Sequence, residues 1–205
     1  MRKTKENTEI SKLRILLAAE EEFCQRGYVA ANMDAIANTA GLTKGAIFWH
    51  YKSKAGLFNA TIQRAIDRIN KINKEAFSSS LPIMEKCRKM IKQIKKDKSF
   101  SILLSLRNAE STGDIPKSVM TELNKSVREI STDISRRFEE AKECGELRAD
   151  ADIRNIFLTI NIVMCGFATS MDLDIMSQLG GNAVINDDSI IDIIFNGLLS
   201  FQIKR

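Results

Sequence analysis

Residues 32–58 read N-M-D-A-I-A-N-T-A-G-L-T-K-G-A-I-F-W-H-Y-K-S-K-A-G-L-F. Asn32 can cap a short helix. The apolar face of that helix would comprise Met33, Ile36, Ala37 and Ala40. Gly41 can adopt the left-handed conformation that ends it, and Thr43 can cap a second helix running to about His50. Two short helices joined by a glycine turn predict a helix-turn-helix, whose second helix fits the major groove of DNA.

The second helix and the residues after it carry charge of one sign. Lys44, Lys52 and Lys54 fall within eleven residues that contain no acid. The aromatic and imidazole side chains interleaved with them are Trp49, His50 and Tyr51. A solvated helix face usually mixes both signs, whereas cations with such donors suit a phosphate backbone. A plain helical hairpin is the alternative, and this exposed chemistry favours DNA binding over it.

The composition is that of an ordinary globular protein. The chain has 205 residues, 44% of them hydrophobic and 28% charged, which is enough for one or two domains with a real core. No run of eighteen apolar residues occurs, and the basic N-terminus lacks the apolar stretch of a signal peptide. We therefore expect a cytoplasmic protein that does not contact membranes.

The residues offer little material for catalysis. His50 is the single histidine, and no C-x-x-C pattern occurs. The scattered thiols are Cys24, Cys87, Cys144 and Cys165, which we interpret as reduced core cysteines. Neither clustered carboxylates nor a phosphate-binding glycine loop is evident. We expect no enzymatic activity, no metal site and no cofactor.

Charge is distributed unevenly about the net value of +5. Residues 1–60 carry nine basic and six acidic side chains, and residues 61–98 carry eleven and four. Residues 99–205 carry eleven and sixteen, so the acidic part lies C-terminal to the cationic part. This separation is typical of a protein that places one end on a polyanion. For the lysines of 82–98, a solvated face of an amphipathic helix is favoured over direct DNA contact.

The remaining sequence predicts helices throughout. A first helix covers about residues 10–26 and ends at Gly27, and a long helix follows Ser53. Further helical segments are predicted at 82–98, at 99–110, between 117 and Gly145, at 152–172 and at 189–203. Sustained strand alternation is absent, and both prolines stand at helix starts. The predicted fold class is all-α.

The last two predicted helices are apolar on more than one side. Such a helix must be covered on more than one side, and a partner subunit is the simplest source of the second cover. A fully interior helix pair within a monomer is the alternative. The predicted dimer interface comprises Ile160, Met164, Phe167, Ile191, Ile194, Phe195 and Leu198. We interpret the linker at 173–188 as a flexible loop, and a segment that shapes the mouth of a pocket is the alternative.

Residues 12–58 resemble the DNA-binding domain of TetR-family transcriptional regulators. The similarity covers K-L-R-I-L-L-A-A-E-E-E-F-C-Q-R-G-Y and then M-D-A-I-A-N-T-A-G-L-T-K-G-A-I-F-W-H-Y-K-S-K-A-G-L-F. The T-K-G-A-I-F-W-H-Y-K-S-K part is most similar to the AcrR/TtgR-type branch, whose members often repress multidrug efflux genes. The resemblance implies an N-terminal three-helix bundle with a helix-turn-helix in residues 1–56. A larger helical domain for effector binding and dimerisation would occupy residues 57–205.

The resemblance also implies roles for individual residues. Those expected to approach bases and backbone are Thr43, Lys44, Gly45 and Ala46, and those expected mainly on phosphates are Trp49, His50, Tyr51 and Lys52. Gly45 would permit close approach because it has no side chain. Phe48 stands where the family often has tyrosine, so one phenol hydrogen bond to phosphate is missing, and Asn32 replaces the usual hydroxyl cap. Gly56 lacks the carboxylate often found there, which predicts a weaker start to the next helix.

Family likeness further implies a ligand cavity among residues 82–171. The candidate lining residues are Phe100, Leu103, Leu104, Arg107, Glu110, Phe138, Phe157, Met164 and Phe167. For each of them ordinary core packing is the alternative. Glu110 could pair with a cationic ligand, or it could bridge Arg107 on the surface. The region holds neither tryptophan nor tyrosine, which disfavours an aromatic cage for quaternary ammonium.

The sequence therefore predicts a homodimeric repressor on double-stranded DNA. Two recognition helices would enter successive major grooves, roughly 34–36 Å apart, on a near-palindromic operator. A small hydrophobic effector would release the protein, which could control an efflux system. Open alternatives are a regulator that senses a fatty-acyl or other metabolite, an activator, and an architectural DNA-binding protein without a ligand.

Overall fold

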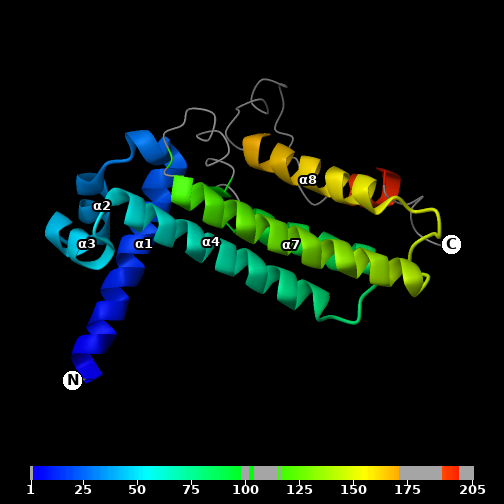
Figure 1. Ribbon diagram of the computed structural model, residues 1–205, viewed down its shortest axis with the longest axis horizontal. Helices are drawn as coiled ribbons and strands as arrows, with labels where there is room; N and C mark the ends of the chain where they lie inside the picture. Colours follow the sequence, from blue (N-terminus) through cyan, green and yellow to red (C-terminus); the bar gives the residue numbers. More distant parts are fainter. Residues whose placement is uncertain (1, 98–101, 104–114, 116, 171–190, 199–205) are drawn as a thin grey trace, which may run out of the picture. The chain divides into compact units, whose positions relative to one another are not determined.

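The computed structural model describes residues 2–97, 102–103, 115, 117–170 and 191–198 (Figure 1). Within these ranges every regular element is a helix, so the predicted all-α fold is confirmed. The chain forms two compact units. Unit 1 comprises residues 1–68 and 99–126, and unit 2 comprises residues 69–98 and 127–205. The predictions of a helix at 99–110 and a loop at 173–188 fall mainly on residues outside the described ranges.

Unit 1 contains the N-terminal helices and the start of a later one. The N-terminal helices are α1 (Arg2–Ala30), α2 (Met33–Ala40), α3 (Lys44–Tyr51) and the first part of α4 (Lys54–Phe77), and the later one is α7 (Lys117–Glu143). α1 begins well before the predicted residue 10. Gly27 interrupts it with φ 70° and ψ 178°, a conformation that is open essentially only to glycine, and one further turn follows. Gly27 is therefore a break inside α1, where the sequence predicted its end.

The core of unit 1 joins α1 and α4 beneath the two short helices. Its fully or almost fully buried side chains include Ile15, Ala19, Phe23, Ile36, Ile47, Leu57, Phe58 and Ile62. The rings of Phe23 and Phe58 meet edge to face with centroids 4.7 Å apart, and Tyr28 lies equally close to Phe58. Ile47 is the buried residue of α3, which leaves the other faces of that short helix available.

A buried carboxylate also ties α1 to α4. Glu20 is only 5% exposed and forms ion pairs with Arg68 and, at 3.8 Å, with Arg64. Because a buried charge is costly when its partner is removed, this cluster fixes the packing of α1 against α4.

Unit 2 contains the remainder of α4 and α7 together with three further elements. These are α5 (Ile83–Lys96), α8 (Ile153–Ser170) and the π-helical segment η1 (Ile194–Leu198). α5 packs against α8. The first amide of α5, on Ile83, donates to Glu146 Oε2 at 2.6 Å, since Pro82 offers no side-chain cap.

Arg88 of α5 connects to the C-terminal segment of the same unit. Its guanidinium donates to Asp192 Oδ1 at 2.7 Å and to Asn196 Oδ1 at 2.9 Å, and lies 5.5 Å from the ring centroid of Phe195. The predicted boundary between residues 56 and 57 falls inside the continuous helix α4. That division into domains stays a prediction, because α4 and α7 each contribute to both units.

Candidate nucleic-acid interface

The helix-turn-helix forms through local caps that the sequence predicted. Asn32 has extended backbone angles, and its Oδ1 accepts from the Asp34 amide at 2.8 Å. Gly41 follows α2 in the left-handed conformation, with φ 62° and ψ 40°. Thr43 then caps α3, since its Oγ1 accepts from the Ala46 amide at 3.2 Å. Asn32 thus has a structural role in the motif, whether or not it also contacts DNA.

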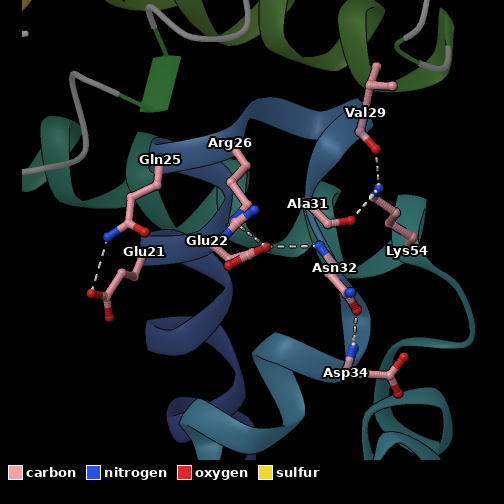
Figure 2. Close-up of polar contacts among 9 residues, drawn as sticks. All are labelled: Glu21, Glu22, Gln25, Arg26, Val29, Ala31, Asn32, Asp34 and Lys54. Atoms are coloured by element: carbon pink, nitrogen blue, oxygen red, sulfur yellow. Dashed lines mark hydrogen bonds and ion pairs between the residues drawn. The ribbon is translucent and has the colours of Figure 1, made fainter.

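The entry to α2 depends on an acid that sequence analysis did not single out. Glu22 of α1 is buried, and its Oε1 accepts from the Asn32 amide at 2.9 Å (Figure 2). Arg26 lies 3.3 Å from the same oxygen. Ten residues separate Glu22 from Asn32, so neither helical spacing nor a turn motif could have indicated this contact.

α3 presents an exposed face with few intramolecular contacts. Ile47 is fully buried, while Trp49 is 66% exposed and Phe48 is 38% exposed. The other exposed residues predicted to contact DNA are Thr43, Lys44, Gly45 and Lys52, and the half-buried ones are Ala46, His50 and Tyr51. A short, capped, cation-bearing helix with an exposed face is compatible with insertion into a major groove.

Lys54 does not belong to this face. Its ammonium donates to the carbonyl oxygens of Val29, at 2.9 Å, and Ala31, at 2.7 Å, at the end of α1 (Figure 2). It also lies 5.2 Å from the ring centroid of Tyr28. Partial burial lowers the pKa of Lys54, and nearby Glu22 opposes that shift. Lys54 caps α1 in the free protein, and its membership of a phosphate-binding cluster with Lys44 and Lys52 stays a prediction.

Tyr51 is engaged inside the protein. Its hydroxyl donates to the carbonyl oxygen of Lys12 at 3.2 Å, and burial raises the pKa of the phenol. This bond joins the end of α3 to α1. The predicted phosphate contact of Tyr51 would have to replace or share that hydrogen bond.

His50 contacts the Trp49 ring and lies near the charge of Lys12 in α1. The His50 and Trp49 rings meet edge to face at 4.6 Å. Burial lowers the pKa of His50, and the charge of Lys12 lowers it further. Because an imidazole of lowered pKa is mostly neutral at pH 7, His50 in the free protein is a hydrogen-bond donor more than a cation.

The two remaining lysines of the predicted site also have partners. Lys44 Nζ lies 2.8 Å from Asp34 Oδ2, across the turn between α2 and α3. Lys52 ends α3 with a positive φ of 63°, and its ammonium donates to the Trp49 carbonyl at 2.8 Å. Residues 44–54 contain no acidic side chain, but the fold brings Asp34 into contact with Lys44.

Two glycines of the motif have opposite surroundings. A Cβ added at Gly45 would meet Thr43 Oγ1 at 3.8 Å, an ordinary contact. A Cβ added at Gly56 would lie 2.2 Å from the carbonyl oxygen of Tyr51. Gly56 is therefore required by the close passage of α3 over the first turn of α4. Nothing inside the described protein requires glycine at 45.

The predicted ligand-binding residues are only partly placed. Phe138 is fully buried in unit 2, Phe157 is half-buried on α8, and Leu103 is half-buried. The residues Phe100, Leu104, Arg107 and Glu110, and the side chains of Met164 and Phe167, lie outside the described parts. Unit 2 holds a mainly polar pocket of about 240 Å³ that includes none of them. It is lined by Phe77, Ile83, Lys86, Arg137, Glu140, Ala141, Cys144 and Glu146.

The predicted interface residues divide between interior and surface. Ile191 is 0%, Phe195 2% and Ile160 6% exposed within the single subunit, so they have almost no surface left for a partner. Ile194 is half-buried, and the side chain of Leu198 lies outside the described parts. The large apolar side chains that unit 2 exposes on α8 and before η1 are Leu158, Ile162 and Ile193. No helix in the described ranges has the length and apolar character needed to cross a bilayer.

Comparison with known proteins places this motif in a family. Residues 15–61 match the family of bacterial regulatory proteins, tetR family. The activator FasR of Mycolicibacterium smegmatis is 45% identical over 56 residues, which are 27% of this chain and 26% of FasR. The regulator TtgR of Pseudomonas putida is 40% identical over 62 residues, 30% of either chain. The matches thus span less than a third of each of these relatives.

Likeness of fold extends over most of the chain. The solved fatty acid degradation regulator FadR from Bacillus halodurans superposes with a TM-score of 0.62. The superposition covers 90% of this chain and 97% of FadR at 19% identity, which establishes similarity of fold alone. Residues 15–61, which match the family, contain the caps, the turn and the exposed helix described above. Residues 15–61 therefore carry the sequence and the local structure of the tetR family of bacterial regulatory proteins.

Proposed function

We propose that this protein is a sequence-specific DNA-binding transcriptional regulator, with α3 as the recognition helix. The observation that carries the proposal is the surface of α3: Lys44, Gly45 and Trp49 are exposed on a short helix held by one buried residue, Ile47. Phosphate contacts would position such a helix, and its first turn would read base edges in the major groove. Membership of the tetR family in this segment supports the proposal.

We further propose that the protein acts as a dimer that a small hydrophobic ligand releases from a near-palindromic operator. The ligand would favour a state in which the two recognition helices no longer fit successive grooves, and it can act only through its differential affinity for the two states. The similarity to the transcriptional regulator TtgR supports the regulatory role on which this model rests. The name of the activator FasR favours activation as the alternative to repression.

Selection of bound duplexes from a random pool tests the DNA-binding function. The expected result is one enriched sequence with two inverted half-sites whose centres lie about one helical turn apart. Recovery of duplexes without a common sequence would support the architectural alternative instead. If the protein retained no duplex at low salt, the proposed function would be wrong.

Replacing Lys52 with alanine should weaken binding to every duplex sequence alike. Lys52 is exposed at the end of α3, where its ammonium can leave the Trp49 carbonyl for a phosphate. Removal of one phosphate contact lowers the slope of log K against log salt by about 0.9. Lys71→Ala is the matched control, since Lys71 is a 77% exposed lysine of unit 2. Equal slopes for Lys52→Ala and wild type would exclude a phosphate contact at Lys52.

The dimer surface is proposed from exposed apolar side chains. Leu158 and Ile162 are 56% and 66% exposed and lie one turn apart on α8, and Ile193 is 68% exposed. Large apolar groups left in water are typical of an interaction surface. Ile160, Ile191 and Phe195 are buried within the subunit. We therefore assign the interface to Leu158, Ile162 and Ile193 instead.

Replacing Ile162 with glutamate should shift the protein from dimer to monomer. A carboxylate buried in an apolar interface is costly, and two copies would meet in a symmetric dimer. Light scattering after size-exclusion chromatography would measure the mass. Val29→Glu is the control, since Val29 is 60% exposed in unit 1. A dimeric Ile162→Glu protein would contradict the assigned surface.

A further inference from the structure

The ion pair between Lys44 and Asp34 joins the first turns of the two helices of the motif. Lys44 Nζ and Asp34 Oδ2 are 2.8 Å apart, and the side chains are 47% and 61% exposed. Asp34 is not the cap of α2, because that role belongs to Asn32. In Figure 2 the Asp34 side chain extends away from the cap, while its amide donates to Asn32. Its carboxylate is thus available to Lys44.

An acid at this position opposes the contact expected of the motif. In a helix-turn-helix the first helix crosses the phosphate backbone and the start of the second meets base edges. Asp34 stands in the first turn of α2, where a negative charge favours the helix dipole but repels phosphate. In the free protein Asp34 also neutralises Lys44, which stands in the first turn of the recognition helix.

We propose that Asp34 determines DNA specificity by acting through Lys44. On DNA of the wrong sequence, Asp34 retains the Lys44 ammonium. On the operator, a base edge with paired acceptors, such as guanine O6 and N7, replaces the carboxylate. An exposed ion pair is weak, so a well-placed base can displace it. This inference rests on the proposed function and adds a specificity-determining residue to it.

The consequence is a difference between operator and random DNA. Wild-type protein gains little from Lys44 on random DNA, because leaving Asp34 for a single phosphate exchanges one weak pair for another. Neutralising Asp34 frees Lys44 to bind any phosphate. Affinity for random DNA should then rise while operator affinity changes little, and the ratio between them should fall.

The test measures binding of the full-length protein to two labelled duplexes by fluorescence anisotropy. One is a random-sequence duplex of about 30 base pairs, and the other is the duplex selected from the random pool, each between about 50 and 200 mM salt. The variants are Asp34→Asn, Asp34→Ser, Lys44→Ala and the double variant Asp34→Asn with Lys44→Ala. Asp67→Asn, at an exposed position of α4, is the matched control for charge. Asp34→Ser provides a second neutral side chain should the asparagine variant fold poorly.

Both neutral variants should bind the random duplex about three- to tenfold more tightly, with a slope against salt steeper by about 0.9. Operator affinity should stay within about threefold, so the specificity ratio falls. In the Lys44→Ala background, neutralising Asp34 should change random-duplex affinity by less than about twofold, and so should Asp67→Asn alone.

Two results would overturn the inference while leaving the proposed function standing. In the first, the gain persists in full without Lys44, which would make Asp34 a simple repulsive charge. In the second, wild type selects an operator but the neutral variants bind random DNA no more tightly. Failure of wild type to bind either duplex would instead remove the proposed function, and the inference with it.

Discussion

Replacing Gly45 with alanine should weaken operator binding about tenfold, or ~1.4 kcal/mol, without harming the fold. The added methyl meets only an ordinary contact inside the protein, at 3.8 Å from Thr43 Oγ1. Alanine is also the better helix former, by about 0.5–1 kcal/mol. A glycine where alanine would fit leaves room for a molecule outside the protein to come close. On our proposal that is the DNA at the start of the recognition helix.

Two measurements on the same protein check this expectation. Urea unfolding should give a midpoint equal to or slightly above that of wild type, and anisotropy with the selected operator should show the loss of affinity. Lys71→Ala, at a 77% exposed position of unit 2, is the control for operator binding. If Gly45→Ala bound the operator as tightly as wild type, close approach of DNA at residue 45 would be excluded.

Replacing Gly56 with alanine should have the opposite pattern and a large effect on stability. The new Cβ would lie 2.2 Å from the Tyr51 carbonyl oxygen, which belongs to the backbone and cannot rotate away. Relief requires α3 and α4 to separate, and the Ser53 cap on the Gly56 amide, at 2.9 Å, would be strained as well. We expect a loss of about 2–3 kcal/mol in the free energy of unfolding.

Urea unfolding followed by circular dichroism measures this loss, with Gly45→Ala as the matched glycine-to-alanine control. The midpoint should fall with little change in slope. Affinity for the operator should fall only in proportion to the fraction of protein in which unit 1 is unfolded or α3 is displaced. A Gly56→Ala protein as stable as wild type would show that the α3–α4 junction has room that the structure does not indicate.

These two glycines illustrate what sequence comparison can miss. At Gly56 the family pattern predicted a weakness, because a favourable carboxylate is absent. The structure shows instead that any side chain there would collide with Tyr51. At Gly45 the pattern predicted a role in close approach, and the open surroundings agree with that prediction. Only coordinates distinguish a glycine that the fold requires from one that it tolerates.

The caps of the helix-turn-helix could be predicted because they are local. Asn32, Gly41 and Thr43 act on amides or carbonyls within a few residues of themselves, so residue type and spacing decide their roles. The same holds for the all-α class, which follows from helical periodicity. The extension of α1 to Arg2 was missed because its first turns are polar and carry no periodic apolar signal.

The partners of the charged groups could not be predicted. Lys54 turns back to the carbonyl oxygens of Val29 and Ala31, more than twenty residues away, and Tyr51 reaches Lys12. Both look like exposed donors in sequence, because nothing local indicates an acceptor. Burial of Ile191 and Phe195 is similar, since an apolar residue suits a core and an interface equally.

The sequence by itself determined the helices, their caps, the tetR-type motif and the set of side chains that α3 can display. These properties depend on contacts between near neighbours and on apolar periodicity. The tertiary structure alone decided which displayed groups have partners inside the protein. Lys54 and Tyr51 donate hydrogen bonds to carbonyl oxygens of α1, and Lys44 forms an ion pair with Asp34. The structure also showed that Leu158, Ile162 and Ile193 are exposed apolar side chains of unit 2. The reason is physical, because hydrogen bonds, ion pairs and burial depend on distance in space, which spacing along the chain does not fix beyond a helical turn or two.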